Sequence, residues 1–269
     1  MSLSDKVRQK PWIGWAIFIA TAVVVFFLGL LANSVMERRT EAQFAFSTAV
    51  KYDNSEPRNA VWGKNFPREY QSYLQTSDTS FRSKYNGGAM IDMLEVDPRL
   101  VVLWAGYGFA KDYNQGRGHY YAIEDIRNTL RTGGPAEGKP SPQPNTCWAC
   151  KSTDVPRMMK VTGPAEFYNG TWDTKGHEIV NAIGCADCHD AKTMNLQISR
   201  PALKEAFERK GIDLAKVSHQ EMRSLVCAQC HVEYFFDKRE PKHNYLTFPW
   251  DNGYTAEDIE RYYDSFMFT

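Results

Sequence analysis

The sequence predicts a mainly α-helical protein with long loops and few strands, preceded by one N-terminal transmembrane helix or signal sequence. Three observations predict this fold class. An uncharged apolar run stands near the N-terminus, helix-start patterns recur along the rest of the chain, and alternating β-branched runs are few. We therefore expect one exported helical region that follows a single apolar segment.

The composition limits the classes of protein that the chain can represent. Its 269 residues include 32 Lys and Arg and 32 Asp and Glu, so the formal net charge is zero. That balance argues against a generally basic nucleic-acid-binding surface and against a polyanionic tail. Hydrophobic residues make up 43% and charged residues 24%, as in globular rather than disordered proteins. We expect one or two folded domains and no nucleic-acid partner.

The apolar run covers residues 12–32 and contains no charged residue. Its length is about what a helix needs to cross a bilayer, and it exceeds the roughly 7–15 residues of a signal-peptide core. Three basic residues precede it: Lys6, Arg8 and Lys10. The positive-inside rule therefore places residues 1–11 in the cytoplasm. We expect residues 12–32 to be a retained anchor, and a signal cleaved near residue 32 is the alternative.

The rest of the chain is exported under either interpretation. We expect residues 33–45 to form a juxtamembrane linker and residues 46–269 to form the main domain. This domain would lie on the periplasmic side, tethered to the inner membrane if residues 12–32 are retained. The chemistry of its cysteines is accordingly that of an oxidising compartment.

Four segments of the main domain carry helix signals: residues 120–130, 201–210, 219–231 and 256–266. The second begins with Pro201, which favours a first helical position, and stops before Gly211. The third and fourth open with capping boxes at Ser218 and Thr255. Residues 133–144 are rich in Gly and Pro and predict a loop.

All six cysteines fall into C-x-x-C pairs: Cys147 and Cys150, Cys185 and Cys188, Cys227 and Cys230. The residues that follow the pairs are Lys151, His189 and His231. C-x-x-C-H is the attachment motif of c-type haem. Two thiols about one helical turn apart reach the two vinyl groups of the porphyrin, and the next residue binds the iron as its proximal ligand.

Three other uses of the cysteines compete with haem attachment. Disulfides are plausible in an exported protein, but C-x-x-C closes only a small loop. Zinc would use the same thiolates, although a zinc ribbon does not explain a His directly after two of the pairs. Thioredoxin-like chemistry would need one pair in a βαβ context rather than three pairs. Haem c explains the two His motifs best.

Lys151 departs from this pattern in an informative way. An amine is an unusual axial ligand, and it must lose its proton to bind iron, so metal and burial must depress its pKa. Such a ligand is expected mainly where the iron is catalytic and its opposite face is open to a substrate.

The motifs in this order resemble the pentahaem cytochrome c nitrite reductases, which form ammonia: Cys147-Trp-Ala-Cys-Lys151, Cys185-Ala-Asp-Cys-His189 and Cys227-Ala-Gln-Cys-His231-Val-Glu-Tyr234. The likeness extends to four further stretches: Arg117-Gly-His119, residues 125–133, Phe248-Pro-Trp-Asp251 and Tyr262-Tyr263-Asp264. It covers roughly residues 36–269.

The resemblance implies a role for individual residues around the catalytic haem. Lys151 would be its proximal ligand, Arg131 would orient nitrite, and Tyr234 would be the active-site tyrosine. Glu233 and Tyr234 would contribute to a calcium site beside this haem.

The resemblance also implies the ligands of two electron-transfer haems, each held by two histidines. His189 and His231 would be their proximal ligands. His119 would be the distal ligand of one of them, the haem attached to Cys227 and Cys230.

The implied activity is the six-electron reduction of nitrite to ammonium, with haem c and calcium as cofactors. The implied electron donor is a membrane-bound multihaem quinol dehydrogenase, and the implied assembly is a homodimer. Members of the family are longer and carry two further C-x-x-C-H motifs, so three haems are expected here and five in a complete member. We therefore expect the 269 residues to be the N-terminal part of such an enzyme, unstable or inactive alone.

Three other functions are compatible with the sequence. A non-catalytic trihaem electron-transfer protein, or an inactive fragment of the enzyme, would bind haem without turning over nitrite. A related multihaem reductase would act on hydroxylamine or a sulfur oxyanion. A zinc-binding anchored protein would carry no haem at all.

Overall fold

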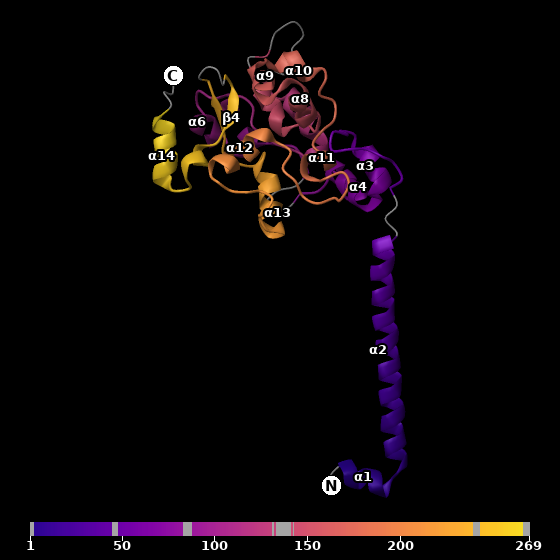
Figure 1. Cartoon of the computed structure of the whole chain (residues 1–269). Helices are drawn as coiled ribbons and strands as arrows, with labels where there is room; N and C mark the ends of the chain where they lie inside the picture. Colours follow the sequence, from indigo (N-terminus) through magenta and orange to yellow (C-terminus); the bar gives the residue numbers. More distant parts are fainter. Residues whose placement is uncertain are drawn as a thin grey trace. The chain divides into compact units, whose positions relative to one another are not determined.

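The computed structural model describes residues 3–44, 48–82, 88–130, 132, 141, 143–238 and 243–265. The chain divides into two compact units, Met1–Ala49 and Val50–Thr269. Figure 1 shows both units.

The first unit consists of two helices, α1 (Leu3–Gln9) and α2 (Trp12–Phe44). Pro11 lies between them, and because proline has no backbone N–H, a helix begins after it more readily than it continues through it. Within the described residues, one helix, Trp12–Arg39, is apolar and long enough to cross a membrane by length and composition. Residues 33–44, expected as a linker, continue α2 as helix.

The second unit is built from short helices. Its α-helices are α3 (Asn59–Asn65), α4 (Pro67–Leu74), α5 (Met93–Val96), α6 (Arg99–Leu103), α7 (Ala122–Asn128), α8 (Asp154–Thr162), α9 (Pro164–Asn169), α10 (Trp172–Gly176), α11 (Cys185–Cys188), α12 (Pro201–Arg209), α13 (His219–Ala228) and α14 (Ala256–Asp264). Its 3₁₀ helices are η1 (Gln75–Ser77), η2 (Gly108–Ala110), η3 (His119–Tyr121), η4 (Asn145–Cys150) and η5 (Pro249–Asn252).

Strands are scarce in the described part of this unit, as the sequence predicts. β1 (Ile91–Asp92) pairs antiparallel with β2 (Asn114–Gln115), and β3 (Phe235–Asp237) pairs antiparallel with β4 (Tyr245–Thr247). The predicted fold class, mainly helical with few strands behind an N-terminal apolar helix, is confirmed.

Local signals set the starts of three predicted helices. The side chain of Ser218 accepts a hydrogen bond from the Glu221 N–H and so begins α13, while Thr255 begins α14 in the same way. Pro201 is the first residue of α12. The helix that carries the third cysteine pair was predicted to reach His231, but α13 ends at Ala228 because the chain closes a turn over the last cysteine.

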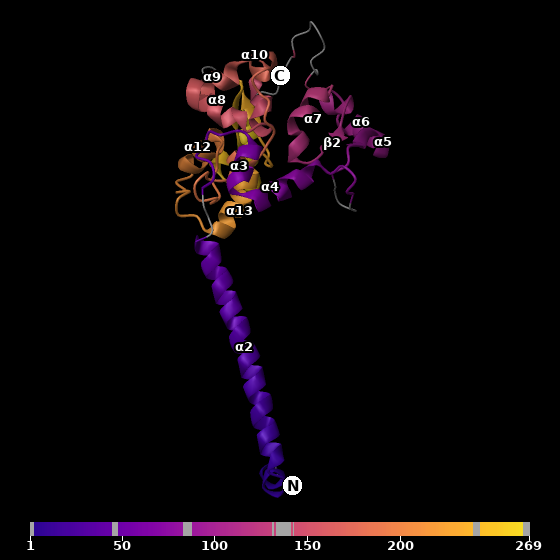
Figure 2. The same ribbon diagram turned by 90° about the vertical axis from the view of Figure 1, so that its right-hand side faces the viewer.

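The main core of the unit is aromatic and aliphatic. Trp148 and Trp172 stack within it at a centroid distance of 3.5 Å, and both are buried. Helices α8, α9 and α10 pack around this pair and lie together in both views (Figures 1 and 2). A smaller cluster contains Trp62 and Ala186, and it packs α3 against the second cysteine motif. Both cores therefore include residues of the cysteine motifs.

Candidate functional site

The three cysteine pairs lie on short helical segments. Cys147 and Cys150 belong to η4, Cys185 and Cys188 span α11, and Cys227 lies near the end of α13 with Cys230 in the turn that follows. In the His motifs the N–H of the histidine donates to the carbonyl of the first cysteine, at 2.9 Å for His189 and 2.8 Å for His231. The pattern C-x-x-C-H thus forms one helical turn, as attachment to a porphyrin requires.

All six cysteines are free thiols. Within the described ranges, no group of three His, Cys, Asp or Glu side chains is arranged to hold a metal ion. These two observations give no support to a disulfide framework or to a zinc site among the residues that the structure describes.

His189 is oriented by a hydrogen bond to the backbone. Its ring Nδ1 lies 2.8 Å from the carbonyl oxygen of Met194, which fits an Nδ1–H donor and leaves Nε2 available to a metal. Met194 has a φ of 58°, which is uncommon for a residue with a side chain. Asp190 stabilises this tight loop, since its carboxylate accepts bonds from Thr193 N (2.9 Å) and Thr193 Oγ1 (2.8 Å).

His119 and His231 are brought together from distant parts of the sequence. Their ring centroids are 6.3 Å apart. Two imidazoles that bind one metal ion from opposite sides, with metal–nitrogen bonds of about 2.0 Å, place their centroids about 6 Å apart. Loss of hydration against the surrounding protein, and then the charge of His231, lower the pKa of His119. This favours the neutral imidazole that binds iron.

The Arg117-Gly-His119 stretch is held in place by contacts with α7 and with Thr76. Arg117 pairs with Asp125 of α7 at 2.6 Å. Gly118 approaches the backbone of Thr76 so closely that a Cβ would overlap the Thr76 carbonyl oxygen. Packing therefore requires glycine at position 118, and this close contact fixes the backbone position of the neighbouring His119.

Lys151 follows η4 and is half-buried. Its backbone N–H donates to the Trp148 carbonyl at 2.9 Å, while its ammonium has no ion-pair or hydrogen-bond partner among the described side chains. Arg127 of α7 supports this segment, with its guanidinium 5.5 Å from the Trp148 ring and bonds to the Gly176 and Ile179 carbonyls.

The first and third pairs lie close together, since Cys150 Sγ is 4.0 Å from the Gln229 carbonyl oxygen. The neighbouring Cys230 thiol lowers the pKa of Cys150 to about 7, and Cys150 in turn raises the pKa of Cys230. Burial raises the pKa of Cys185 to about 11 and that of Cys188 to about 12. The cysteine motifs of Lys151 and His231 therefore adjoin each other.

The residues present fit covalently attached haem c. The thiols are free and correctly spaced, His189 presents Nε2, and the His119–His231 separation suits two ligands of one iron. The described residues offer fewer ligands for calcium. Glu233 accepts a hydrogen bond from the Tyr263 hydroxyl, and the described residues bring no carboxylate cluster to it.

Tyr234 precedes β3 and is half exposed, with its ring stacked on Phe236 at a centroid distance of 5.4 Å. Arg131, predicted to orient the substrate, lies outside the described residues. Its neighbours are fixed, since the Asp112 carboxylate accepts bonds from Thr129 Oγ1 (2.7 Å) and Leu130 N (2.6 Å).

Three polar residues at the centre of the motifs were not predicted as site residues: Asp187, Arg200 and Gln229. All three are buried, and they bond to one another and to the motif backbones. The sequence contains a signal for two of them. Asp187 and Gln229 each follow an alanine between the two cysteines of a C-x-x-C pair, where a polar side chain lies close to both thiols.

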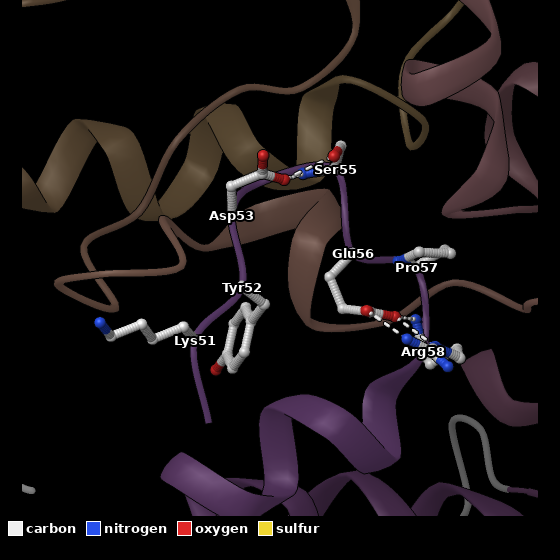
Figure 3. Close-up of a pocket in the computed structure, with 7 residues that line it drawn as sticks. All are labelled: Lys51, Tyr52, Asp53, Ser55, Glu56, Pro57 and Arg58. Atoms are coloured by element: carbon white, nitrogen blue, oxygen red, sulfur yellow. Dashed lines mark hydrogen bonds and ion pairs between the residues drawn. The ribbon is translucent and has the colours of Figure 1, made fainter. Parts of the chain in front are cut away.

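A shallow groove lies elsewhere in the unit. It is lined by Lys51, Tyr52, Asp53, Ser55, Glu56, Pro57 and Arg58. Its carboxylates are engaged locally, Asp53 with Ser55 and Glu56 with Arg58 at 2.7 Å (Figure 3).

Comparison with known proteins finds relatives that share one name. Two proteins named cytochrome c-552, from Porphyromonas gingivalis and Bacteroides fragilis, are 58% and 55% identical over 265 and 258 residues. The alignments cover 97% and 96% of this chain but 53% and 52% of the relatives. The chain thus spans about half the length of the curated relatives it matches.

A solved structure agrees with the sequence comparison. The catalytic subunit of cytochrome c nitrite reductase from Desulfovibrio desulfuricans, a protein with two calcium sites, matches with a TM-score of 0.73 at 33% identity. The match covers 80% of this chain and 48% of that one. The sequence profile of cytochrome c552 matches residues 58–269, nearly the whole second unit. The chain belongs to the cytochrome c552 family.

Proposed function

We propose that this chain supplies the lysine-ligated haem centre of a cytochrome c nitrite reductase that reduces nitrite to ammonium. The observation that carries the proposal is the C-x-x-C-K motif, whose half-buried Lys151 amine has no acidic partner among the described residues. Two C-x-x-C-H motifs accompany it, and the solved relative in the same fold is itself a nitrite reductase.

The reaction adds six electrons and eight protons to one nitrite and yields ammonium and two waters. Bound haem c would supply the iron that takes nitrite and the path by which electrons reach it. Lys151 would hold the proximal side as a neutral amine. Arg131 would pair with the anion and keep it oriented, and the Tyr234 hydroxyl would donate hydrogen bonds or protons to the oxygen atoms that leave as water.

The remaining ligands would serve electron transfer. His189 would bind one iron through Nε2, with its tautomer fixed by the Met194 carbonyl. His119 and His231 would bind another from opposite sides, in keeping with their 6.3 Å centroid separation. The chain would therefore carry three haems, at Cys147/Cys150, Cys185/Cys188 and Cys227/Cys230. The calcium ligands Glu233 and Tyr234 stay a prediction from the resemblance.

The proposed setting is the periplasmic face of the inner membrane. Residues 12–32 would be an anchor or an export signal, residues 1–11 would stay in the cytoplasm, and residues 46–269 would form the haem domain. A membrane-bound multihaem quinol dehydrogenase would donate electrons, and the complete enzyme would be a homodimer.

Nitrite binding tests the proposal. The haem-loaded chain should show a visible spectral change on addition of nitrite, whereas ammonium formation is expected only from the complete enzyme. Lys151→His should alter the nitrite response, because the amine ligand is replaced by an imidazole. Lys160→His, at an exposed position of α8, is the matched control and should leave the response unchanged.

Two outcomes would contradict the proposal. A nitrite response identical in wild type and Lys151→His would remove the special role of the lysine. Three haems without any response to nitrite would favour the trihaem electron-transfer protein instead.

A further inference from the structure

The three cysteine motifs meet at one buried arginine. Arg200 immediately precedes α12, and its side chain is 1% exposed. Its Nε donates to the Ala149 carbonyl at 2.6 Å and its Nη2 to the Ser152 carbonyl at 3.0 Å, on either side of Cys150 and Lys151. The guanidinium thus holds the backbone of the lysine motif at two points.

The same guanidinium reaches the second motif. Arg200 Nη1 lies 2.6 Å from Asp187 Oδ1, and the Asp187 side chain is 3% exposed. The other carboxylate oxygen of Asp187 accepts a bond from the Gly184 N–H at 2.7 Å, which opens the α11 turn. The charge of Asp187, between Cys185 and Cys188, is therefore balanced by Arg200.

Gln229 joins the third motif to this pair. Its Nε2 donates to the Asp187 carbonyl at 2.8 Å, and its Oε1 accepts from the backbone N–H of Ser199 at 3.0 Å and of Arg200 at 3.2 Å. Gln229 lies directly before Cys230 and is 2% exposed. The intervening residues of all three motifs thus converge on Arg200.

A buried charge beside redox centres acts on them electrostatically. In a low-dielectric interior a nearby cation disfavours the more positive oxidised iron, so it raises the reduction potential, and an unpaired carboxylate lowers it. Burial works against the charged form of Arg200, but the groups around it, Asp187 first, together outweigh burial, so the pKa of Arg200 is raised and it stays charged. Breaking such a pair leaves one uncompensated charge.

We propose that Arg200 is a positioning residue that fixes the three haem-attachment motifs relative to one another and, paired with Asp187, sets the reduction potentials of the haems attached there. The inference rests on the proposed function, because it requires haem at these motifs.

The test measures reduction potentials of the haem-loaded chain by spectroelectrochemistry, with haem number counted by intact mass. Arg200→Met leaves Asp187 unpaired and should shift the potentials to more negative values. Asp187→Asn leaves Arg200 unpaired and should shift them to more positive values. Opposite shifts are the signature of charge, because structural damage alone would move both variants in the same direction.

Two further variants complete the design. Arg200→Lys keeps the charge and should stay close to the wild-type potentials even if loss of the backbone bonds lowers stability. Arg209→Met is the matched control, because Arg209 is the last residue of α12 and pairs with Asp251 at 2.5 Å but is 44% exposed. It should leave the potentials unchanged.

Each outcome decides the inference. Three bound haems with unmoved potentials, or shifts of the same sign in Arg200→Met and Asp187→Asn, would overturn it while leaving the proposed function intact. If Arg200→Met fails to accumulate, Asp187→Asn and Arg200→Lys decide, and an unchanged or more negative potential in Asp187→Asn overturns the inference. A wild-type chain without haem would instead overturn the proposed function itself.

Discussion

The two C-x-x-C-H motifs share a sequence pattern and differ in what holds their histidines. His189 is half-buried, and a carbonyl five residues later orients its ring within a tight loop. His231 is exposed, and the ring that approaches it comes from His119, in a segment far earlier in the chain. The first histidine is organised locally and the second by tertiary structure.

This difference separates attachment from orientation. The cysteine spacing alone specifies where a porphyrin can be attached, whereas the surroundings of each histidine decide how firmly a second ligand and the ring orientation are fixed. Changes at His119 should therefore act on the third motif alone, and changes in the 190–195 loop should act on the second.

Removal of His119 should have the largest effect. In the haem-loaded chain, His119→Ala should convert one haem from low-spin to high-spin, because its iron loses one of two imidazole ligands. The other haems should keep their spectra. Visible and electron paramagnetic resonance spectroscopy would measure the change.

His177→Ala is the control for this prediction, since His177 is exposed and lies beside Glu178 at 3.9 Å. An unchanged spin state in His119→Ala, or the same change in His177→Ala, would exclude His119 as the partner of His231.

Loss of the Asp190 carboxylate should destabilise the loop that orients His189. Its oxygens accept four bonds, two from Thr193, one from Lys192 N (3.1 Å) and one from Asn54 Nδ2 (3.1 Å). Asp190→Ala should lower the free energy of unfolding by about 1–2 kcal/mol, measured by denaturant titration.

Asp213→Ala is the control for this second prediction, because Asp213 also accepts a bond from a backbone N–H nearby, at Ala215, but touches no cysteine motif. An equal loss of stability in both variants would mean that the 190–195 loop has no special role.

Removal of the N-cap of α13, the helix that carries Cys227, should have a smaller effect. Ser218→Ala removes the acceptor for the Glu221 N–H and should cost about 1 kcal/mol of unfolding free energy. Ser224→Ala, at an exposed position within α13, should change stability by only a few tenths of a kcal/mol. If both substitutions had the same effect, the capping box would not stabilise α13.

The smallest expected effect is on the pH dependence of stability. Hydrogen bonds from Asn54 and then Thr193 hold the pKa of Asp190 below its usual value. A lowered folded pKa stabilises the protein at pH values above the unfolded pKa of about 4, and this contribution is lost as the pH falls further. The stability difference between wild type and Asp190→Ala should therefore shrink below about pH 4, and a difference that grows there would contradict this account.

Local features of the fold were predictable and long-range ones were not. The capping boxes at Ser218 and Thr255 and the proline at residue 201 act within one helical turn, so the sequence displays them completely. The end of α13 was not predictable in the same way, because the C-x-x-C-H turn replaces helix after Ala228.

The site shows the same division. The cysteine spacing and the residues Lys151, His189 and His231 are readable from the sequence, and the resemblance to a family added His119. Arg200 was not predicted, because its role depends on contacts with motifs some 50 residues before it and 30 after it, which no local pattern displays.

Intact mass of the chain, purified from a host that matures c-type cytochromes, tests the central claim most directly. The account predicts the polypeptide plus three haems, with the lysine motif at Cys147 and Cys150 loaded like the two histidine motifs. The same measurement shows whether residues 1–32 are retained. A polypeptide with two haems would contradict attachment at the lysine motif, and one without haem would contradict the account as a whole.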